Sequence, residues 1–355
     1  MDASTQTIPA LLLDWYDAHR RSLPWRSPPG SPPPDPYAVW LSEVMLQQTT
    51  TAAVAPYFAK FLGRWPDVIA LAEADEGEVM AAWAGLGYYA RARNLIACAK
   101  AVAATGGQFP TTEAELRKLP GLGAYTAAAI AAIAFGERAT VVDANVERVT
   151  TRLFAIATPI PGARVQIRTA VEVLTPANRP GDFAQAMMDL GATVCTPRAP
   201  RCLLCPLARH CAGRRLGPEQ FPVKPIKAAK PQRCGRAFWI ERDRQVWLVR
   251  RENAGMLGGM RSLPDDGWAA RADGDKRPPL GGAWTAGGSV RHSFTHFDLD
   301  LQLMVYSGAD CSRLAAQQGE WWALDRLDEA GLPTLFAKAA RLAMVGAGSG
   351  RIIGD

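Results

Sequence analysis

The sequence has no apolar stretch that could cross a lipid bilayer. Its longest uninterrupted run, from Ala127 to Phe135, is far shorter than the ~20 apolar residues that a spanning helix needs. We also expect no secretory signal, because Asp2, Asp14 and Asp17 surround the brief apolar patch near the start. We find no internal repeat, and 48% hydrophobic with 21% charged residues excludes a disordered or fibrous chain. The 355 residues therefore predict a globular protein of two domains or three lobes.

Cysteine is too scarce for a disulfide framework. There are seven cysteines, an odd number, in a chain for which we expect no secretory signal. Four of them are concentrated in one short segment: Cys195, Cys202, Cys205 and Cys211. Four neighbouring thiolates can hold one tetrahedral zinc ion or one iron–sulfur cluster, and the spacing alone does not choose between the two.

The excess of positive charge is small overall but is concentrated around these cysteines. The whole chain carries +6, whereas residues 195–236 contain ten Lys or Arg and one acid, Glu219, and so carry +9. Subtracting +9 from +6 leaves −3 for the rest of the chain. A basic segment around a metal loop indicates a surface that binds phosphates, as in a nucleic-acid partner.

The first 215 or so residues have the composition of a helical domain. Residues 37–48 place Tyr37, Trp40, Leu41, Val44 and Met45 on one apolar stripe, after a helix start at Asp35-Pro36. We expect further helices over residues 8–21, 51–62, 75–84, 90–104, 112–118, 124–135, 143–155, 164–175 and 181–192.

The last third of the chain has a different character. Residues 217–235 are rich in Pro and Lys and indicate a linker. Beyond it, Ala237–Val249 predicts two strands around a polar turn, Ser293–Tyr306 contains the alternating pattern of a half-buried strand, and a helix follows over 333–345. We therefore expect an α+β domain over residues 236–350.

A tight glycine turn joins two of the expected helices. Leu119-Pro120-Gly121-Leu122-Gly123-Ala124-Tyr125-Thr126 lets the backbone approach a ligand closely, and the free N–H groups of the next helix point outward. Such a turn binds phosphate without reading sequence. A plain helix–helix turn would look alike if only Gly-x-Gly were considered.

These motifs together resemble a known family. The hairpin, residues 141–149 (VVDANVERV) and the spacing of the four cysteines resemble the helix-hairpin-helix DNA glycosylases with a [4Fe–4S] cluster. Pro24-Trp25-Arg26, residues 41–49 (LSEVMLQQT) and residues 85–91 (GLGYYAR) narrow the resemblance to the MutY-type adenine DNA glycosylases.

The resemblance implies a fold and a division of the chain. The expected fold is an all-α, two-lobed helix-hairpin-helix core with an iron–sulfur cluster loop, followed by a C-terminal α+β Nudix-like domain. The core would span residues 1–216, with a six-helix lobe over about 27–139 and a cluster lobe built from 1–26 and 140–216. Cys195, Cys202, Cys205 and Cys211 would hold the [4Fe–4S] cluster rather than zinc.

Cleavage of a deoxyadenosine N-glycosidic bond needs protonation of the base and stabilisation of a cationic sugar, which two carboxylates can share. Glu43 lies off the main apolar stripe, but its neighbours Val39 and Leu46 favour a raised pKa and a role as general acid. The resemblance assigns it protonation of adenine at N7. Asp143 indicates a helix N-cap on sequence grounds. The resemblance makes Asp143 the group that stabilises the sugar oxocarbenium ion, supported by Asn145 and Tyr125.

The resemblance also places residues that handle DNA. Tyr125 stands where lyase-competent relatives have a Lys, so we expect a monofunctional enzyme that leaves the strand intact. Gln48 and Tyr88 match wedge residues that help to flip the base, and Leu119, Gly121 and Gly123 belong to the phosphate-binding hairpin. Arg26 and Asp189 align with groups that line the adenine pocket. Ala144 stands where the family often has Gly, and we expect little effect from this change.

The C-terminal domain resembles a Nudix domain without its catalytic helix. Residues 248–251 (LVRR), 256–259 (MLGG) and Leu263-Pro264 match, but no Glu-rich run follows to hold Mg²⁺, so triphosphate hydrolysis is not expected. The family uses a Phe-Ser-His loop here to recognise 8-oxoguanine, and this chain has Phe294, Thr295 and His296. A strand-edge Thr-His pair without this role is the simpler alternative.

The sequence is compatible with three functions. The first is an adenine glycosylase acting on A:8-oxoguanine or A:G mispairs in double-stranded DNA, as a monomer without membrane contact, in the bacterial cytoplasm at the nucleoid. The second is a bifunctional glycosylase of the same fold for pyrimidine lesions, against which Tyr125 argues. The third is a cluster-bearing DNA-binding module without catalysis, against which Glu43 and Asp143 argue.

Overall fold

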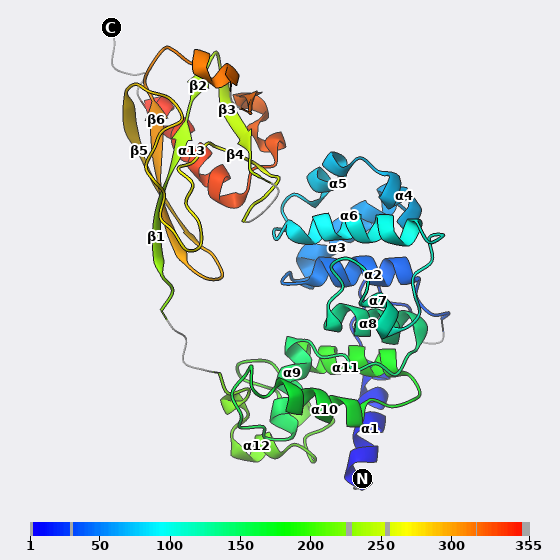
Figure 1. Cartoon of the computed structure of the whole chain (residues 1–355). Coiled ribbons are helices and arrows are strands. Elements are labelled where there is room, and N and C mark those ends of the chain that lie inside the picture. Colours follow the sequence, from blue (N-terminus) through cyan, green and yellow to red (C-terminus); the bar gives the residue numbers. More distant parts are fainter. Residues whose placement is uncertain (1–2, 29–30, 225–228, 253–255, 317, 350–355) are drawn as a thin grey trace. The chain divides into compact units, whose positions relative to one another are not determined.

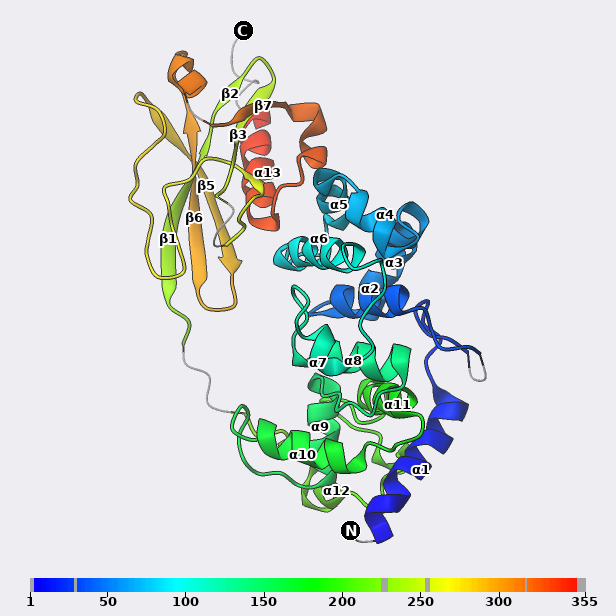
Figure 2. The same ribbon diagram turned by 45° about the vertical axis from the view of Figure 1, so that its right-hand side comes forward.

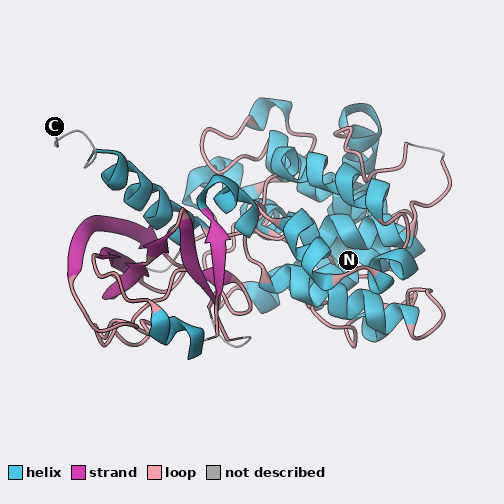
Figure 3. Cartoon of the chain, turned by 90° about the horizontal axis from the view of Figure 1, so that it is seen from above, coloured by secondary structure: helices cyan, strands magenta, loops and turns pink. Residues whose placement is uncertain are grey.

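The computed structural model describes residues 3–28, 31–224, 229–252, 256–316 and 318–349. The chain divides into two compact units, Met1–Ile226 and Lys227–Asp355. Figure 3 shows helices throughout the first unit, whereas all the strands lie in the second. No helix in the described part of the chain is both long and apolar enough to cross a membrane.

The first unit is helical, as the apolar periodicity predicts. Its α-helices are α1 (Ala3–His19), α2 (Pro36–Leu46), α3 (Thr51–Arg64), α4 (Val68–Glu73), α5 (Glu76–Trp83), α6 (Ala90–Ala103), α7 (Glu113–Leu116), α8 (Ala124–Phe135), α9 (Ala144–Leu153), α10 (Arg164–Leu174), α11 (Pro180–Thr193) and α12 (Ala212–Leu216). The helix over 37–48 and the nine further expected helices are confirmed to within a few residues. Helices α4 and α12 were not predicted because each is too short to show a periodic stripe.

The chain itself supplies the helix starts. Asp35 accepts the backbone N–H of Tyr37 at 3.0 Å, and Pro36 occupies the first position of α2, where its missing N–H costs nothing. Asp143 caps α9 in the same way. All five stripe residues of α2 are buried. The rest of its central part, residues 39–45, is buried too, so Glu43 lies inside the core and not beside the stripe.

One apolar core runs through the first unit, and five helices pack in sequence along it. Helix α2 packs on α8, α8 packs on α11, and α11 packs on both α9 and α1 (Figure 1). This packing brings together side chains from segments that are more than a hundred residues apart in the sequence. The first turn of α8 and the cap of α9 thereby come close to the buried face of α2.

The second unit is built on two small sheets and one helix. Its strands are β1 (Gln232–Trp239), β2 (Glu241–Arg242), β3 (Gln245–Arg250), β4 (Arg261–Ser262), β5 (Trp284–Ser293), β6 (Asp298–Tyr306) and β7 (Glu320–Ala323), and α13 spans Thr334–Ser349. One sheet has the order β1-β6-β5, and in the other β3 pairs with β2, β4 and β7. Figure 2 shows α13 beside these strands, and its apolar residues share a core with those of β6.

The strand predictions for this unit need two corrections. Strand β1 begins at Gln232, inside the expected linker, because it pairs in parallel with β6 along its whole length. The segment Ser293–Tyr306 contains β6, which follows the last residue of β5 and a turn, so the half-buried strand predicted there is confirmed. The alternating burial of Leu299, Leu301 and Leu303 in β6 matches the expected pattern. Strand β5 was missed because it is mostly exposed and is interrupted by Gly287 and Gly288.

Candidate active site

Glu43 is a buried carboxyl with one strong hydrogen-bond partner. Only 5% of its surface is exposed, and the Tyr125 hydroxyl donates a hydrogen bond to its Oε2 at 2.8 Å. Burial raises the pKa of Glu43 to about 7. The Tyr125 hydrogen bond and the charge of Arg26 lower the pKa, and the charge of Asp143 raises it. The carboxyl therefore exchanges its proton near neutral pH, which suits a general acid.

Asp143 is held by hydrogen bonds to both of its oxygens. Its Oδ1 accepts the Val146 backbone N–H at 2.7 Å as the cap of α9, and its Oδ2 accepts the Asn145 side-chain amide at 2.7 Å. The helix N-terminus favours a negative charge at this point. Ala144 is exposed, so its methyl group does not disturb this arrangement. The hydrogen bond by which Asp143 caps α9 also helps to fix the orientation of its carboxylate, so the capping role is compatible with a catalytic one.

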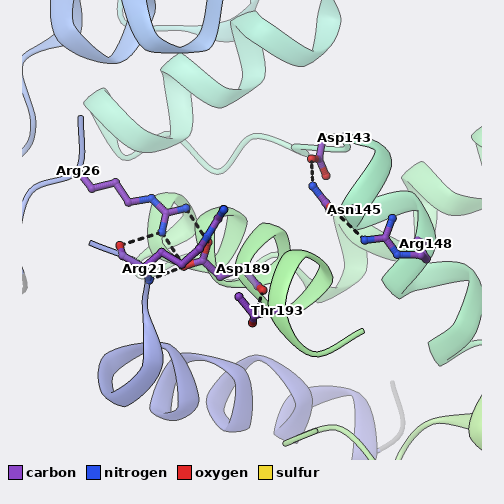
Figure 4. Close-up of polar contacts among 7 residues, drawn as sticks. All are labelled: Arg21, Arg26, Asp143, Asn145, Arg148, Asp189 and Thr193. Atoms are coloured by element: carbon purple, nitrogen blue, oxygen red, sulfur yellow. Dashed lines mark hydrogen bonds and ion pairs between the residues drawn. The ribbon is translucent and has the colours of Figure 1, made fainter. Parts of the chain in front are cut away.

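A chain of hydrogen bonds leads from Asp143 to the cysteine loop, and Figure 4 shows its first part, from Asp143 through Asn145 to Arg148. Arg148 donates from Nη2 to Asn145 Oδ1 at 2.8 Å and to the Gly191 carbonyl at 2.7 Å, and from Nε to the Cys195 carbonyl at 2.8 Å. Gly191 allows this approach, because a Cβ there would lie 2.6 Å from the Asn145 Cβ. The orientation of Asp143 therefore depends on residues of α11 and of the cysteine loop.

Asp189 is a fully buried carboxylate between two arginines. Arg26 binds it through Nη1 and Nη2 at 2.6 and 2.9 Å, and Arg21 through Nε at 2.6 Å and its backbone N–H at 2.9 Å. Its pKa is lowered, since these hydrogen bonds and charges outweigh the effect of its burial. Figure 4 shows Arg21 and Arg26 converging on Asp189 of α11. Arg26 and Asp189, both expected in a base pocket, thus pair with each other and fix the segment after α1 to α11.

The four clustered cysteines surround one small cavity. Cys195, Cys202, Cys205 and Cys211 all line it, and each is partly buried. Burial and, to a smaller extent, the nearby cysteines raise the pKa of the Cys205 thiol to about 12. Among the described residues, no three Cys, His, Asp or Glu side chains are placed to hold a single metal ion.

Arg152 organises the loop that carries these cysteines. It is 1% exposed, and it donates to the carbonyls of Cys195, Thr196, Pro197 and Phe221 at 2.7–3.2 Å. Its Nη1 also donates a hydrogen bond to Cys195 Sγ at 3.3 Å. The basic residues of the loop, in contrast, face solvent: Arg198, Arg201, Arg209, Arg214, Arg215 and Lys224 are exposed.

The glycine turn connects the active site to an exposed loop. Gly121 has φ +75°, and a Cβ there would lie 2.6 Å from the Asn94 Cβ, so this position requires glycine. Gly123 caps α8 with extended backbone and is exposed, while Leu119 is half-buried. Tyr125 belongs to the first turn of α8. The same helix therefore carries both the free N–H groups of that turn and the tyrosine that contacts Glu43.

The two expected wedge residues share an unusual backbone. Gln48 has φ +56° and Tyr88 has φ +48°, left-handed values that residues other than glycine rarely adopt. Both side chains are exposed, and Tyr88 is 54% exposed although it is a large aromatic. Strained backbone below an exposed side chain is typical of functional positions.

In the second unit, Thr295 and His296 form the tip of a hairpin. The Phe294 N–H donates to the Phe297 carbonyl at 2.9 Å, which leaves these two residues exposed between β5 and β6. The Phe294 ring stacks on Phe297, with ring centroids 4.7 Å apart. Lys230 supports the base of the hairpin, since its Nζ donates to the Phe294 carbonyl at 2.6 Å. The Thr295 hydroxyl is thus presented on a supported tip.

Sequence reasoning assigned no role to the arginines that hold these groups in place: Arg21, Arg91, Arg148 and Arg152. A signal existed for two of them. Arg91 occupies the apolar stripe of α6 one turn before Leu95, and Arg152 lies between Val149 and Leu153 among the buried positions of α9. A charged residue at a stripe position points to a buried network of backbone acceptors.

Two family models match the chain. Residues 41–173 match the HhH-GPD superfamily of base excision DNA repair proteins, and residues 236–342 match the NUDIX domain. The first match contains Glu43, Tyr125 and Asp143, and the second contains the hairpin of Thr295.

Several curated proteins are similar along much of the chain. The adenine DNA glycosylase of Homo sapiens is 33% identical over 93% of this chain and 73% of its own length. That of Mycolicibacterium smegmatis is 41% identical over 67% of this chain and 77% of its own. That of Arabidopsis thaliana is 39% identical over 73% of this chain, but the match spans only 47% of the plant protein.

Solved structures resemble the first unit. A thermostable thymine-DNA glycosylase has a TM-score of 0.54 with 28% identity, and covers 60% of this chain and 97% of its own. Endonuclease III, trapped as a covalent intermediate with DNA, has a TM-score of 0.51 with 23% identity over 61% of this chain and 99% of its own. The second of these likenesses concerns the fold alone.

Proposed function

The chain belongs to the adenine DNA glycosylase family, and from this premise we propose that it removes adenine mispaired with 8-oxoguanine or guanine from duplex DNA without cutting the strand. It is a DNA glycosylase that acts on N-glycosidic bonds. The observation that carries the finer proposal is the pair of Glu43, with a pKa of about 7, and Asp143, held by two hydrogen bonds. Such a pair divides acid and electrostatic work between two carboxyls.

Glu43 would protonate the leaving base. Its Oε2 already accepts the Tyr125 proton, so the mobile proton belongs on Oε1. Burial raises the pKa of Tyr125 well above 10, which keeps its hydroxyl protonated and its donor role constant at neutral pH. Protonation of adenine at N7 weakens the glycosidic bond because the base then leaves as a neutral molecule.

Asp143 would stabilise the positive charge that develops on the sugar. Its hydrogen bonds with Val146 and Asn145 fix the plane of the carboxylate before substrate arrives, so the charge is preorganised. A covalent adduct with Asp143, as in retaining glycosidases, is compatible with this orientation. Arg148 would maintain it through Asn145.

The assay that tests this function uses four duplexes with adenine opposite 8-oxoguanine, guanine, cytosine or thymine. We expect release of adenine from the first two, and strand breaks only after alkali, because Tyr125 has no amine that could form a Schiff base. Efficient borohydride trapping with strand cleavage would favour the bifunctional alternative. Duplex binding without any base release would favour the DNA-binding module.

The cysteine loop fits a [4Fe–4S] cluster, which we propose as its cofactor. All four cysteines line one cavity, and the Arg152 guanidinium lies beside Cys195. Four thiolates suit either a zinc ion or a cluster, and the family resemblance favours the cluster. The bound cluster would supply structural order, holding the exposed basic side chains of the loop against the DNA backbone. This chemistry requires no redox step.

Optical spectroscopy of the purified protein distinguishes the two cofactors. We expect a brown preparation with broad visible absorption, lost together with duplex affinity when Cys202 is changed to Ser, because one of the four ligands is removed. A colourless preparation that contains one zinc per chain would contradict the cluster. Metal analysis of the same sample provides that control.

The C-terminal unit would read the base opposite adenine. Thr295 and His296 offer a hydroxyl and an imidazole on an exposed hairpin tip, where they could hydrogen-bond with 8-oxoguanine. In the four-duplex assay, a preference for 8-oxoguanine over guanine is the expected result of such reading. We further propose that the protein works as a monomer on genomic DNA, at the nucleoid in the cytoplasm of a bacterium.

A further inference from the structure

Arg91 is a buried guanidinium that joins two loops far apart in the sequence. It is 8% exposed and belongs to the first turn of α6. Its Nη1 donates to the carbonyls of Val44 and Met45 at 3.1 and 2.7 Å. Its Nη2 donates to the carbonyls of Leu86 and Gly87 at 3.0 and 3.2 Å.

These contacts flank the two strained residues. Met45, whose carbonyl accepts from Arg91, comes before Gln48 in the chain. Thr49 comes directly after Gln48, and its Oγ1 accepts a hydrogen bond from Arg91 Nη2 at 3.1 Å. The Gly87 carbonyl directly precedes Tyr88, and the guanidinium lies 5.7 Å from the centre of the Tyr88 ring. One side chain thereby binds the backbone before Gln48, the hydroxyl of Thr49 after it, and the backbone next to Tyr88.

The buried charge is stabilised by backbone dipoles. Within the described part of the chain, no carboxylate forms an ion pair with Arg91, while the last carbonyls of α2 offer the negative end of a helix dipole. Burial lowers the pKa of Arg91 only to about 10, so the side chain remains charged at neutral pH. Removing it would leave four buried carbonyls without this donor.

We propose that Arg91 is a positioning residue that holds the Gln48 and Tyr88 loops as one rigid wedge for extrusion of the target base. This inference rests on the proposed function, because it concerns the step that precedes adenine excision. Unstacking a paired base costs a few kcal/mol, and a wedge can meet that cost only if its backbone does not yield. The strained φ values of both loops need an external restraint, which Arg91 provides.

The test compares two DNA substrates that differ only in the cost of flipping. One is a fully paired duplex with adenine opposite 8-oxoguanine, and in the other the two flanking base pairs are mismatched, so that adenine is already loosened. We expect Arg91→Met to slow single-turnover excision about 100-fold on the paired duplex and about 3-fold on the loosened one. Arg91→Lys keeps the charge but not the two-loop span, and we expect a loss of about 10-fold on the paired duplex alone.

A second variant tests the same link without touching the buried charge. Thr49→Val removes one acceptor of Arg91, and we expect about a 3-fold loss on the paired duplex and none on the loosened one. Lys100→Met is the matched control, since Lys100 is an exposed residue of the same helix that pairs with Glu76. Thermal unfolding of each variant checks that it is folded.

The outcomes separate this inference from the proposed function. If the folded Arg91 variants lose the same factor in excision rate on both duplexes, the role of Arg91 is a general structural one and the proposal is overturned. Excision at the rate of the unaltered protein on both duplexes would overturn it too. If the unaltered protein releases adenine from neither duplex, the proposed function itself fails. A selective loss on the paired duplex supports the wedge.

Discussion

Glu43→Gln is expected to abolish adenine excision while duplex binding stays within about 2-fold of the unaltered protein. The amide has the shape of the acid but cannot donate the proton that the leaving base needs, and loss of a general acid costs about 10²–10⁴ in rate. Single-turnover excision from the A:8-oxoguanine duplex, with binding measured on the same DNA, checks this. Excision at the normal rate would exclude Glu43 as the acid.

The pH dependence follows from the raised pKa. The acid form of Glu43 predominates below its pKa of about 7, so the rate should be level at lower pH and fall about tenfold per unit above it. The Tyr125 hydrogen bond lowers this pKa, so Tyr125→Phe should move the decline to higher pH. A rate that does not change across neutral pH would contradict this assignment.

The same burial has an effect on stability that serves as a folding control. The folded pKa of about 7 exceeds the ordinary 4.5, so burial of the ionised group destabilises the fold increasingly as pH rises through this interval. Glu43→Gln removes this penalty, which is on the order of 3 kcal/mol above pH 7. Chemical denaturation should therefore show that the free energy of unfolding of the variant, relative to that of the unaltered protein, increases from about pH 5 to about pH 8.

Asp143→Asn is expected to lower excision about 1,000-fold, because a neutral amide does not stabilise a cationic sugar. The Oδ1 of the new asparagine at position 143 can still accept the Val146 N–H. Its Nδ2 would then face the side-chain amide of Asn145, which is also a donor, so the second hydrogen bond is lost. Both the charge and the orientation are lost. Single-turnover rates on the A:8-oxoguanine duplex measure the loss.

Asp75→Asn is the matched control for capping. Asp75 is an exposed cap of α5 that accepts the Glu78 N–H at 2.9 Å, so its change tests an N-cap without any link to the site. We expect normal excision from it. If Asp143→Asn lost no more activity than Asp75→Asn, then capping would be the whole role of Asp143.

The helical unit was largely predictable because its signals are local. Apolar stripes and capping residues such as Asp35 and Asp143 lie within a few positions of the helices that they define. The strands of the second unit were less predictable because their pairing is not local. Strand β1 begins early only because β6, more than sixty residues later, offers it a parallel partner.

The candidate site divides in the same way. Glu43, Tyr125 and Asp143 stand in motifs that the sequence displays, and the structure brings Tyr125 into contact with Glu43. Apart from the hydrogen bond of Arg148 to Asn145, the arginines that support the site have side-chain partners 42–168 residues away, or bind backbone carbonyls that any sequence could offer. A sequence pattern does not show which backbone carbonyl a buried guanidinium will bind.

The pairing of Arg26 with Asp189 also has a consequence for synthesis of the chain. The two residues are 163 positions apart, so at the usual rate of translation Asp189 emerges from the ribosome about 10–30 s after Arg26. During that interval, α1 and the arginines that follow it have no partner on α11. The newly made N-terminal segment must therefore stay available, neither aggregated nor bound elsewhere, until the second half of the unit arrives to enclose it.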